Sequence, residues 1–324
     1  MERQTSGIDY PLVSIISINY DHPEVTCKML ETLQRVSYPS IEVIIIDNNS
    51  PRDDPSMITK SHPWVKFIQL KENLGFAGAN NIGIRMAKGK YILLLNNDTE
   101  VPEGFLEPLV DKMEADKLIA VVSPKIKFYY TPELLQYTGV PKFNKISART
   151  IGHGFYKPDN GQFEKDSETH FAHGAAMLIS MEAIKKVGLM ADIFFLYYEE
   201  MDWCERFRKN GYKIFYVHNS LVYHKESVST GKMSPLKAYY MNRARLLFLR
   251  RHVDRPLVFI SIAYLLLISF PKNTFLPLIK GRPDLFNAYH KAVVWHLHHL
   301  NHDAVRVSPA FSHIDDIELE TYLK

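Results

Sequence analysis

Cysteine is scarce in this chain, which has only Cys27 and Cys204 among 324 residues. Two isolated cysteines form no zinc-finger or disulfide framework, and such chains are typical of reducing compartments. The N-terminal stretch MERQTSGIDYP also lacks the apolar core of a signal peptide. We therefore expect a cytoplasmic location, peripheral on the inner face of the cytoplasmic membrane if the chain touches one.

A large excess of charge of one sign is missing too. The formal net charge is +3 and the pI is about 8.6, which is too mild to indicate a nucleic-acid partner. No Walker A sequence occurs. The chain contains 46% hydrophobic and 23% charged residues, a composition typical of a globular protein. Its 324 residues suffice for one large domain with additions.

Short apolar runs alternate with helical patterns in the first part of the chain. We expect strands at residues 12–18, 41–46, 65–70, 91–95 and 119–122, with helices at 23–36 and 76–87. This alternation predicts an α/β fold, a single Rossmann-like, mostly parallel sheet with helices on both faces.

The alternation stops at residues 124–169, which are rich in Tyr, Phe, Gly and Pro and suit hairpins and loops. Beyond them we expect a strand at 175–180, a helix at 181–187, an acidic run before a helix ending near Gly211, and a strand at 213–217. We divide the chain into a catalytic domain, residues 1–234, and a helical C-terminal extension, residues 235–324.

The extension contains the uncharged run 257–270, LVFISIAYLLLISF. Its 14 residues are fewer than the about 20 that an ordinary membrane-spanning helix needs. Two interpretations stay open: a helix that packs into the core, or one that lies in a bilayer interface. Flanking basic residues favour an anionic membrane surface; they are Arg250, Arg251, Arg255, Lys272, Lys280 and Arg282.

Polar side chains follow four of the expected strands. They are Asn19 and Tyr20, Asp47 to Asn49, Asn73, and Asn96 to Asp98. Parallel strands bring such residues to one sheet edge, where open α/β sheets bind ligands. Carboxylate and amide groups there suit a nucleotide, and the Asp98 oxygen suits Mg²⁺ or Mn²⁺ bound to a phosphate. An Asn-rich turn without a ligand is the alternative at Asn96 to Asp98.

The segment NLGFAGANNIG holds Gly75, Gly78 and Gly83, which allow close backbone approach at a helix N-terminus. It is not the GxGxxG fingerprint and follows the third expected strand, so an NAD site is disfavoured.

The order of motifs resembles family 2 glycosyltransferases with the GT-A fold, nearest to their rhamnosyltransferase-like bacterial branch. The matching pieces span residues 12–229: SIISINY, VIIIDNNS, ENLGFAGANNIGI, YILLLNNDTEVP, HGAAMLISMEAIKKVG, FFLYYEEMDWCERFRKNGYKI and VYHKESVS. The resemblance implies inverting transfer of a sugar from a nucleotide diphosphate sugar, such as dTDP-rhamnose or a UDP-sugar. It also implies Mn²⁺ or Mg²⁺ as cofactor and a hydroxyl of a lipid-linked or surface polysaccharide as acceptor.

The resemblance also assigns roles to residues. Asp98 matches the last acid of the family's metal-binding DxD motif, whose first position here is Asn96, and His224 matches the second metal-contacting position. Glu200 matches the catalytic base. The donor-binding set is Asn19, Tyr20, Asp47, Asn49, Asn73, Gly75, Asn80 and Asn97; the acceptor-binding set is His173, Gly174, Glu199, Asp202 and Trp203.

The chemistry agrees with these roles. A bound cation neutralises the diphosphate leaving group, and a carboxylate base that takes the acceptor proton contributes about 10² to 10⁴ in rate. Simpler alternatives exist: His224 as an ordinary strand-end histidine, the acidic run as a solvated helix start, and Trp203 as core.

Two other functions compete with this one. A catalytically silent sugar-binding or scaffold subunit of a polysaccharide assembly complex needs none of the set Asp47, Asp98, Glu200 and His224. A nucleotidyltransferase needs a Gly-rich, basic loop after the first strand, and NYDHPEV is neither.

Overall fold

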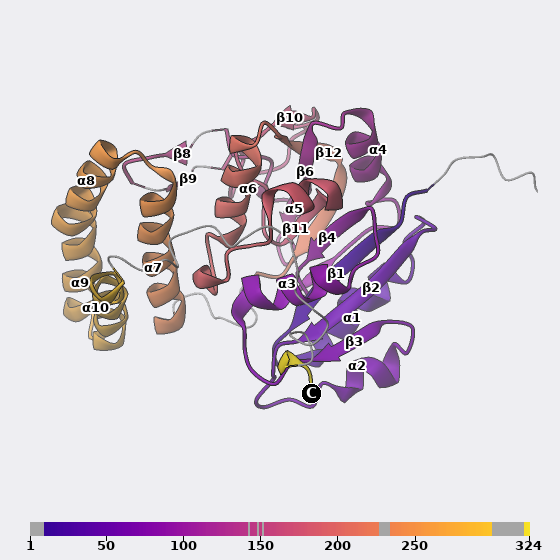
Figure 1. The fold of residues 1–324 in the computed structure, drawn as a ribbon, viewed down its shortest axis with the longest axis horizontal. Coiled ribbons are helices and arrows are strands. Elements are labelled where there is room, and N and C mark those ends of the chain that lie inside the picture. The colour runs from indigo at the N-terminus through magenta and orange to yellow at the C-terminus, as the bar shows by residue number, and fades with distance from the viewer. Residues whose placement is uncertain (1–9, 142, 148, 151, 227–233, 300–320) are drawn as a thin grey trace, which may run out of the picture.

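The computed structural model describes residues 10–141, 143–147, 149–150, 152–226, 234–299 and 321–324. One twisted sheet forms the centre of the larger lobe, and four C-terminal helices stand beside it (Figure 1). The strand order is β10-β12-β6-β11-β4-β1-β2-β3, with β5 paired to β12 and β7 paired to β6.

Four parallel strands make up the N-terminal half of the sheet. They are β1 (Val13–Asn19), β2 (Ile41–Asp47), β3 (Lys66–Gln69) and β4 (Tyr91–Leu95). Their apolar runs are buried because helices cover the sheet. The register pairs Asn19 with Asp47, so both polar residues reach the same carboxyl edge. These four strands confirm the predicted parallel sheet.

The C-terminal half of the sheet is mixed. Strands β6 (Ile119–Phe128) and β12 (Lys213–His224) run parallel to each other, while β11 (Ala176–Ser180) runs antiparallel between β4 and β6. The short strands are β5 (Thr99–Glu100), β7 (Leu135–Tyr137) and β10 (Ser167–Glu168), and β8 (Phe143–Asn144) pairs with β9 (Arg149–Thr150) in a separate hairpin.

The helices of this lobe are α1 (Pro23–Leu33), α2 (Ser56–Ser61), α3 (Gly75–Met86), α4 (Glu107–Ala115), α5 (Met181–Val187) and α6 (Glu199–Lys209). Two sequence expectations differ from the structure. The acidic run does not precede a helix but forms the first turn of α6, where the helix dipole stabilises negatively charged side chains. The strand expected to end at residue 217 continues to His224 as β12, because the pairing with β6 shifts register after Val217 instead of ending.

The extension consists of α7 (Pro235–His252), α8 (Arg255–Tyr264), a π-helical turn (Leu265–Ser269), α9 (Phe270–Ile279) and α10 (Pro283–His298). Residues Pro256–Ile279 form one helix of 24 residues, long and apolar enough to cross a membrane by length and composition. It is therefore longer than the expected 14-residue run. Only 19% of its most apolar window is buried, which disfavours the interpretation as a core helix.

Helix α7 belongs to the main core by packing. Its residues Ala244, Leu247 and Phe248 are buried in the same apolar cluster as the sheet. The division at residue 234 stays a prediction, and this contact shows that the start of the extension is firmly attached.

Candidate active site

A cavity of about 390 Å³ lies at the carboxyl ends of β1 and β4. Residues from distant parts of the chain line it, as expected where parallel strands end together. Eleven of the predicted site residues share this wall: Tyr20, Asn73, Gly75, Asn80, Asn97, Asp98, His173, Gly174, Glu199, Glu200 and His224.

The amide side of the cavity is shaped by Asn48. Its Nδ2 donates to Oδ1 of Asn73 (2.9 Å), and its Oδ1 accepts from the backbone N of Leu74 (2.9 Å). Gly75 follows with φ of 70°, a left-handed backbone that suits glycine. A Cβ atom on Gly75 would lie 2.3 Å from the carbonyl oxygen of Phe195. The N-terminus of α3 therefore meets the segment that leads into α6.

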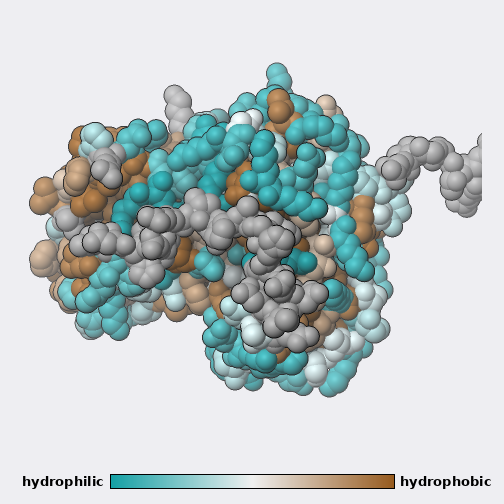
Figure 2. Space-filling model, in the orientation of Figure 1, coloured by the Kyte–Doolittle hydropathy of each residue, from teal (hydrophilic) through white to brown (hydrophobic). Residues whose placement is uncertain are grey.

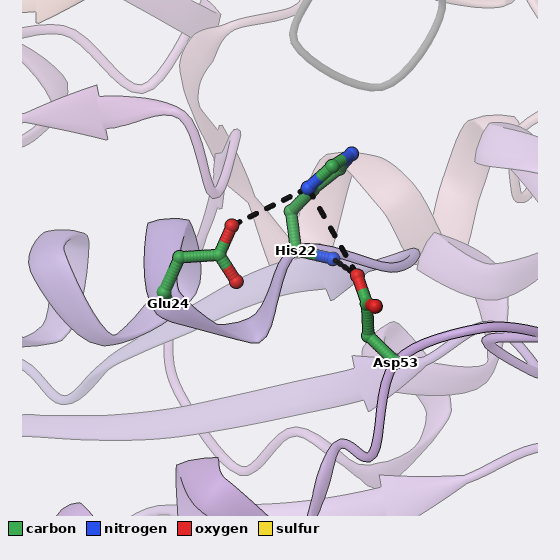
Figure 3. Close-up of side chains that lie close together, drawn as sticks. All are labelled: His22, Glu24 and Asp53. Atoms are coloured by element: carbon green, nitrogen blue, oxygen red, sulfur yellow. Dashed lines mark hydrogen bonds and ion pairs between the residues drawn. The ribbon is translucent and has the colours of Figure 1, made fainter.

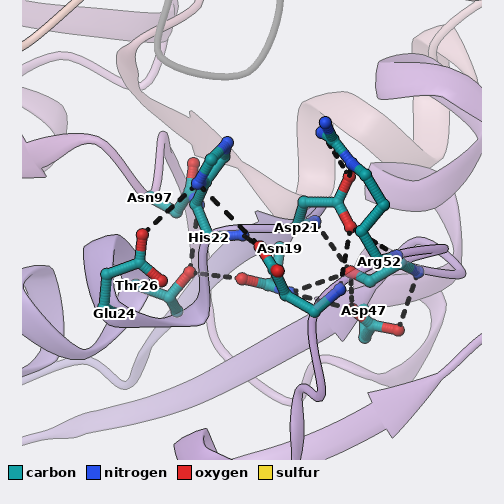
Figure 4. A network of polar contacts seen from close by, with 10 residues as sticks. Asn19, Asp21, His22, Glu24, Thr26, Asp47, Arg52 and Asn97 are labelled. Atoms are coloured by element: carbon teal, nitrogen blue, oxygen red, sulfur yellow. Dashed lines mark hydrogen bonds and ion pairs between the residues drawn. The ribbon is translucent and has the colours of Figure 1, made fainter.

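Three predicted donor-binding residues do not reach the cavity wall. Asn19 and Asp47 are completely buried, and Nδ2 of Asn19 donates to Oδ1 of Asp47 over 2.8 Å. Figure 4 shows this network, which continues from Asn19 through Thr26 to Asn97. Asn49 instead accepts a hydrogen bond from Nζ of Lys324 (2.7 Å). The correction is that Asn19 and Asp47 support the wall from beneath, Asn49 points elsewhere, and Asn48 takes the lining position.

Asp98 and His224 meet at the centre of the cavity. Oδ1 of Asp98 lies 3.1 Å from Nε2 of His224, and Nδ1 of His224 lies 2.8 Å from Oε1 of Gln136. An amide oxygen accepts, so Nδ1 donates to it; in the tautomer that carries its proton on Nδ1, the lone pair of Nε2 points toward Asp98. Oδ1 of Asp98 is buried and accepts no hydrogen bond from the described residues.

Oδ1 of Asp98 and Nε2 of His224 are two buried acceptor atoms that face each other, an arrangement that a cation would stabilise. A carboxylate oxygen and an imidazole nitrogen are ligands that Mn²⁺ accepts. His173 stands behind this pair, with its ring 5.9 Å from that of His224. Burial lowers the pKa of His173 to about 3, so this neighbour adds no competing positive charge. The residues present therefore fit a divalent cation.

The acid pair Glu199 and Glu200 opens α6 and lines the same cavity. The chain enters the helix through residues with positive φ, namely Phe195, Tyr197 and Tyr198, a backbone that costs free energy and is frequent at functional sites. A Cβ atom on Gly174 would lie 3.7 Å from Cγ of Glu200. The absent side chain at Gly174 thus leaves the space beside Glu200 open.

The two carboxyl groups are in different protonation environments. Burial raises the pKa of Glu200 to about 7. Burial and the charge of Glu200 raise the pKa of Glu199 well above its ordinary value, and its Oε2 has no hydrogen bond among the described residues. The raised pKa of Glu199 favours its protonated form, while Glu200 titrates near neutrality, the range that suits a general base.

Asp202 and Trp203 are corrections to the predicted acceptor-binding set. Both are 0% exposed. Asp202 bonds to Arg206, Arg251 and His252, and the indole Nε1 of Trp203 donates to the carbonyl of Gly188. The helical periodicity turns them away from the cavity that Glu199 and Glu200 face.

A second group of possible ligands lies outside this cavity, where the start of α1 meets the loop after β2. Nδ1 of His22 is 3.3 Å from Oε1 of Glu24 and 3.9 Å from Oδ2 of Asp53 (Figure 3). Their side chains are 37%, 57% and 42% exposed. Exposed carboxylates keep their hydration and pair weakly, so this group is a surface ion cluster rather than a buried centre.

Comparison with known proteins agrees with the geometry. Residues 14–188 match the model of a family described as Glycosyl transferase family 2. The chain is 27% identical over 206 residues to the low-salt glycan biosynthesis hexosyltransferase Agl10 of Haloferax volcanii, covering 62% of this chain and 63% of Agl10. It is also 27% identical over 254 residues to the dTDP-rhamnosyl transferase RfbF of Shigella flexneri, covering 71% of this chain and 80% of RfbF.

Some relatives are much longer. The chain spans 25% of the protein y4gI of Sinorhizobium fredii and 18% of the O-antigen biosynthesis protein RfbC of Myxococcus xanthus.

Solved structures share the fold. The mannosyltransferase PcManGT from Pyrobaculum calidifontis, in complex with GDP-Man and Mn²⁺, superposes with a TM-score of 0.55 at 15% identity, over 90% of this chain and 76% of that one. GalNAc-T7 with UDP, GalNAc and Mn²⁺ gives 0.64 at 16% identity, over 89% and 57%. These likenesses confirm the predicted GT-A architecture.

Proposed function

The chain belongs to glycosyl transferase family 2, and on that premise we propose that it transfers a sugar, with inversion, from a nucleotide diphosphate sugar to a hydroxyl group of a lipid-linked or surface polysaccharide. The observation that carries the proposal is that two groups line one cavity, the Asp98 and His224 pair and the Glu199 and Glu200 pair.

The donor binds along the amide side. Asn73, Asn80 and Asn97 offer hydrogen bonds to ribose and phosphate, and Gly75 lets the diphosphate approach the backbone at the start of α3. The names of relatives support two donor classes, since RfbF is a dTDP-rhamnosyl transferase and WfaP of Escherichia coli acts on UDP-Glc. dTDP-rhamnose and UDP-sugars are therefore the first donors to test.

Asp98 and His224 are the residues that would hold Mn²⁺ or Mg²⁺. When bound, such a cation neutralises the charge that develops on the diphosphate leaving group. Gln136 fixes the ring of His224 and so presents Nε2 toward that position.

Glu200 takes the proton of the acceptor hydroxyl as its oxygen attacks the anomeric carbon. The raised pKa of Glu200 makes it a stronger base than an ordinary carboxylate. Burial and the charge of Glu200 raise the pKa of Glu199, and its protonated form adds no second negative charge beside the attacking hydroxyl. His173 and Gly174 form the wall beside Glu200 where an acceptor ring fits.

A thermal-shift screen of nucleotide sugars with Mn²⁺ or Mg²⁺ tests the proposal. A ligand at 100 times its dissociation constant stabilises a protein by about 2.7 kcal/mol, which is a clear shift. Stabilisation by a nucleotide sugar that disappears on chelation supports the proposal. The absence of a shift with every donor, in protein that unfolds cooperatively, would contradict it.

A further inference from the structure

The helix Pro256–Ile279 exposes an apolar face. Along this 24-residue element five large apolar side chains are strongly exposed: Phe259 (70%), Leu267 (76%), Ile268 (58%), Phe275 (62%) and Ile279 (82%). Figure 2 shows brown, hydrophobic atoms gathered at the left of the molecule, over α8 and α9. A soluble monomer rarely exposes a contiguous apolar patch of this kind.

The two serines of the same helix point inward. Ser261 is 0% exposed, and its Oγ donates to the carbonyl oxygens of Lys145 and Leu257. Ser269 is 7% exposed, and its Oγ accepts from Nη2 of Arg245 (3.1 Å). A helix on a water-exposed surface has the opposite pattern. The reversal indicates that the outer face is made for an apolar medium.

The basic residues near this apolar face indicate which apolar medium the helix contacts. Lys272 is exposed within the helix, Lys280 is exposed directly after it, and Lys291 is exposed on α10. Basic residues that border an apolar helix face favour anionic lipid. A second copy of this surface would bring the same positive charges together, so charge complementarity favours a lipid surface over self-association.

We propose that α8 and α9 form a docking surface that embeds its outer face in the interface of an anionic bilayer. The helix lies along the membrane rather than across it, because its inner face packs on α7 and α10, where Arg245 and His296 are buried. Helix α7 joins this surface to the cavity, since its residues Leu236 and Lys237 line the cavity wall. The inference does not depend on the reaction that the cavity catalyses.

Vesicle flotation of the full chain tests the docking surface. The probes are vesicles of phosphatidylcholine alone and vesicles that also contain phosphatidylglycerol. The wild-type chain is expected to float with the anionic vesicles. Leu267→Glu and Ile279→Glu place a charge where a side chain should enter lipid, and each is expected to lower partitioning roughly tenfold to a hundredfold. Lys272→Gln and Lys280→Gln should each lower it about fivefold, and only with anionic lipid.

The matched control is Leu118→Glu, which makes the same substitution at a 53% exposed leucine on the sheet lobe. It should float like the wild type. Because positions 267 and 279 are exposed, circular dichroism should show all variants equally folded. The proposal is overturned if the wild type stays in the soluble fraction, or if Leu267→Glu and Ile279→Glu float unchanged. It is also overturned if sedimentation shows that these substitutions dissociate a dimer while flotation is unaffected.

Discussion

Nε of Arg251 in α7 lies 2.6 Å from Oδ1 of Asp202 in α6, and both side chains are buried. Asp202 also accepts from Nε of Arg206 over 2.9 Å and lies 2.7 Å from Nε2 of His252. The carboxylate therefore attaches the helix that carries Glu200 to the C-terminal extension. Asp202 therefore has a structural role, in which it pairs with basic side chains, and it does not contact an acceptor.

Arg251→Met should destabilise the fold, because it leaves the carboxylate of Asp202 buried with fewer partners. Breaking a buried pair from one side costs about 3–5 kcal/mol, and urea unfolding measures it. The control is Arg208→Met, whose partner Glu205 and own side chain are partly exposed; there we expect a loss of about 1 kcal/mol or less. Equal stability of the two variants would refute the role of the buried pair.

Acid should weaken the same attachment. Burial alone would raise the pKa of Asp202, but the hydrogen bond from His252 and the charges of Arg206 and Arg251 outweigh it, and the pKa lies well below its ordinary value. The stability from this group is thus present above the unfolded pKa of about 3.9 and is lost as pH falls below it. Urea midpoints across this range should decline more steeply for the wild type than for Asp202→Asn. Parallel declines would show that other carboxylates dominate.

Glu200→Gln should keep donor binding and lose about 10² to 10⁴ in turnover. Because the base must be ionised, the wild-type rate should rise with pH through about 7, the pKa to which burial raises Glu200. Glu200→Asp should retain more activity than Glu200→Gln. Single-turnover rates at saturating donor separate chemistry from binding. The assignment fails if Glu200→Gln turns over normally while Glu199→Gln is inactive with its donor binding intact.

Gly75→Ala should disturb both the fold and the donor side of the cavity. The new Cβ would lie 2.3 Å from the carbonyl oxygen of Phe195, at a φ of 70°, and strain of this kind costs about 1–3 kcal/mol. We expect a lower urea midpoint and weaker nucleotide binding by calorimetry. Gly104→Ala is the control, because a Cβ at Gly104 meets nothing within 4 Å. Similar behaviour of the two variants would show that the contact between α3 and Phe195 is unimportant.

The sequence predicted the parallel half of the sheet well, because apolar runs such as that before Asn96 end abruptly in polar residues. It also predicted Asp98, His224 and Glu200 as site residues; the structure brings all three to one cavity, and their roles stay predictions. It missed Gln136, which lies on β7 in the segment without periodicity. That contact is made over 88 residues of chain, and a pairing at that distance leaves no local pattern.

The errors share one physical cause. Asp202 has the same charge as Glu199 and Glu200, and only the arrangement of α6 and α7 shows that it faces basic residues instead of the cavity. The His22, Glu24 and Asp53 cluster likewise forms only because the start of α1 meets the loop after β2. The run 257–270 predicted an apolar helix. The sequence did not indicate that Ser261 and Ser269 point inward, because their hydrogen-bond partners are Lys145 and Arg245, which lie far away in the sequence.

Release of nucleoside diphosphate from a nucleotide sugar tests the central claim most directly. The assay compares the wild type, Asp98→Asn and the surface control Asp111→Asn, each with Mn²⁺ and with a chelator, using the donor found in the thermal-shift screen. The account predicts release by the wild type and by Asp111→Asn that stops on chelation, and release by Asp98→Asn that is at the chelated level throughout. Release by Asp98→Asn with the same rate and metal dependence as the wild type would contradict it.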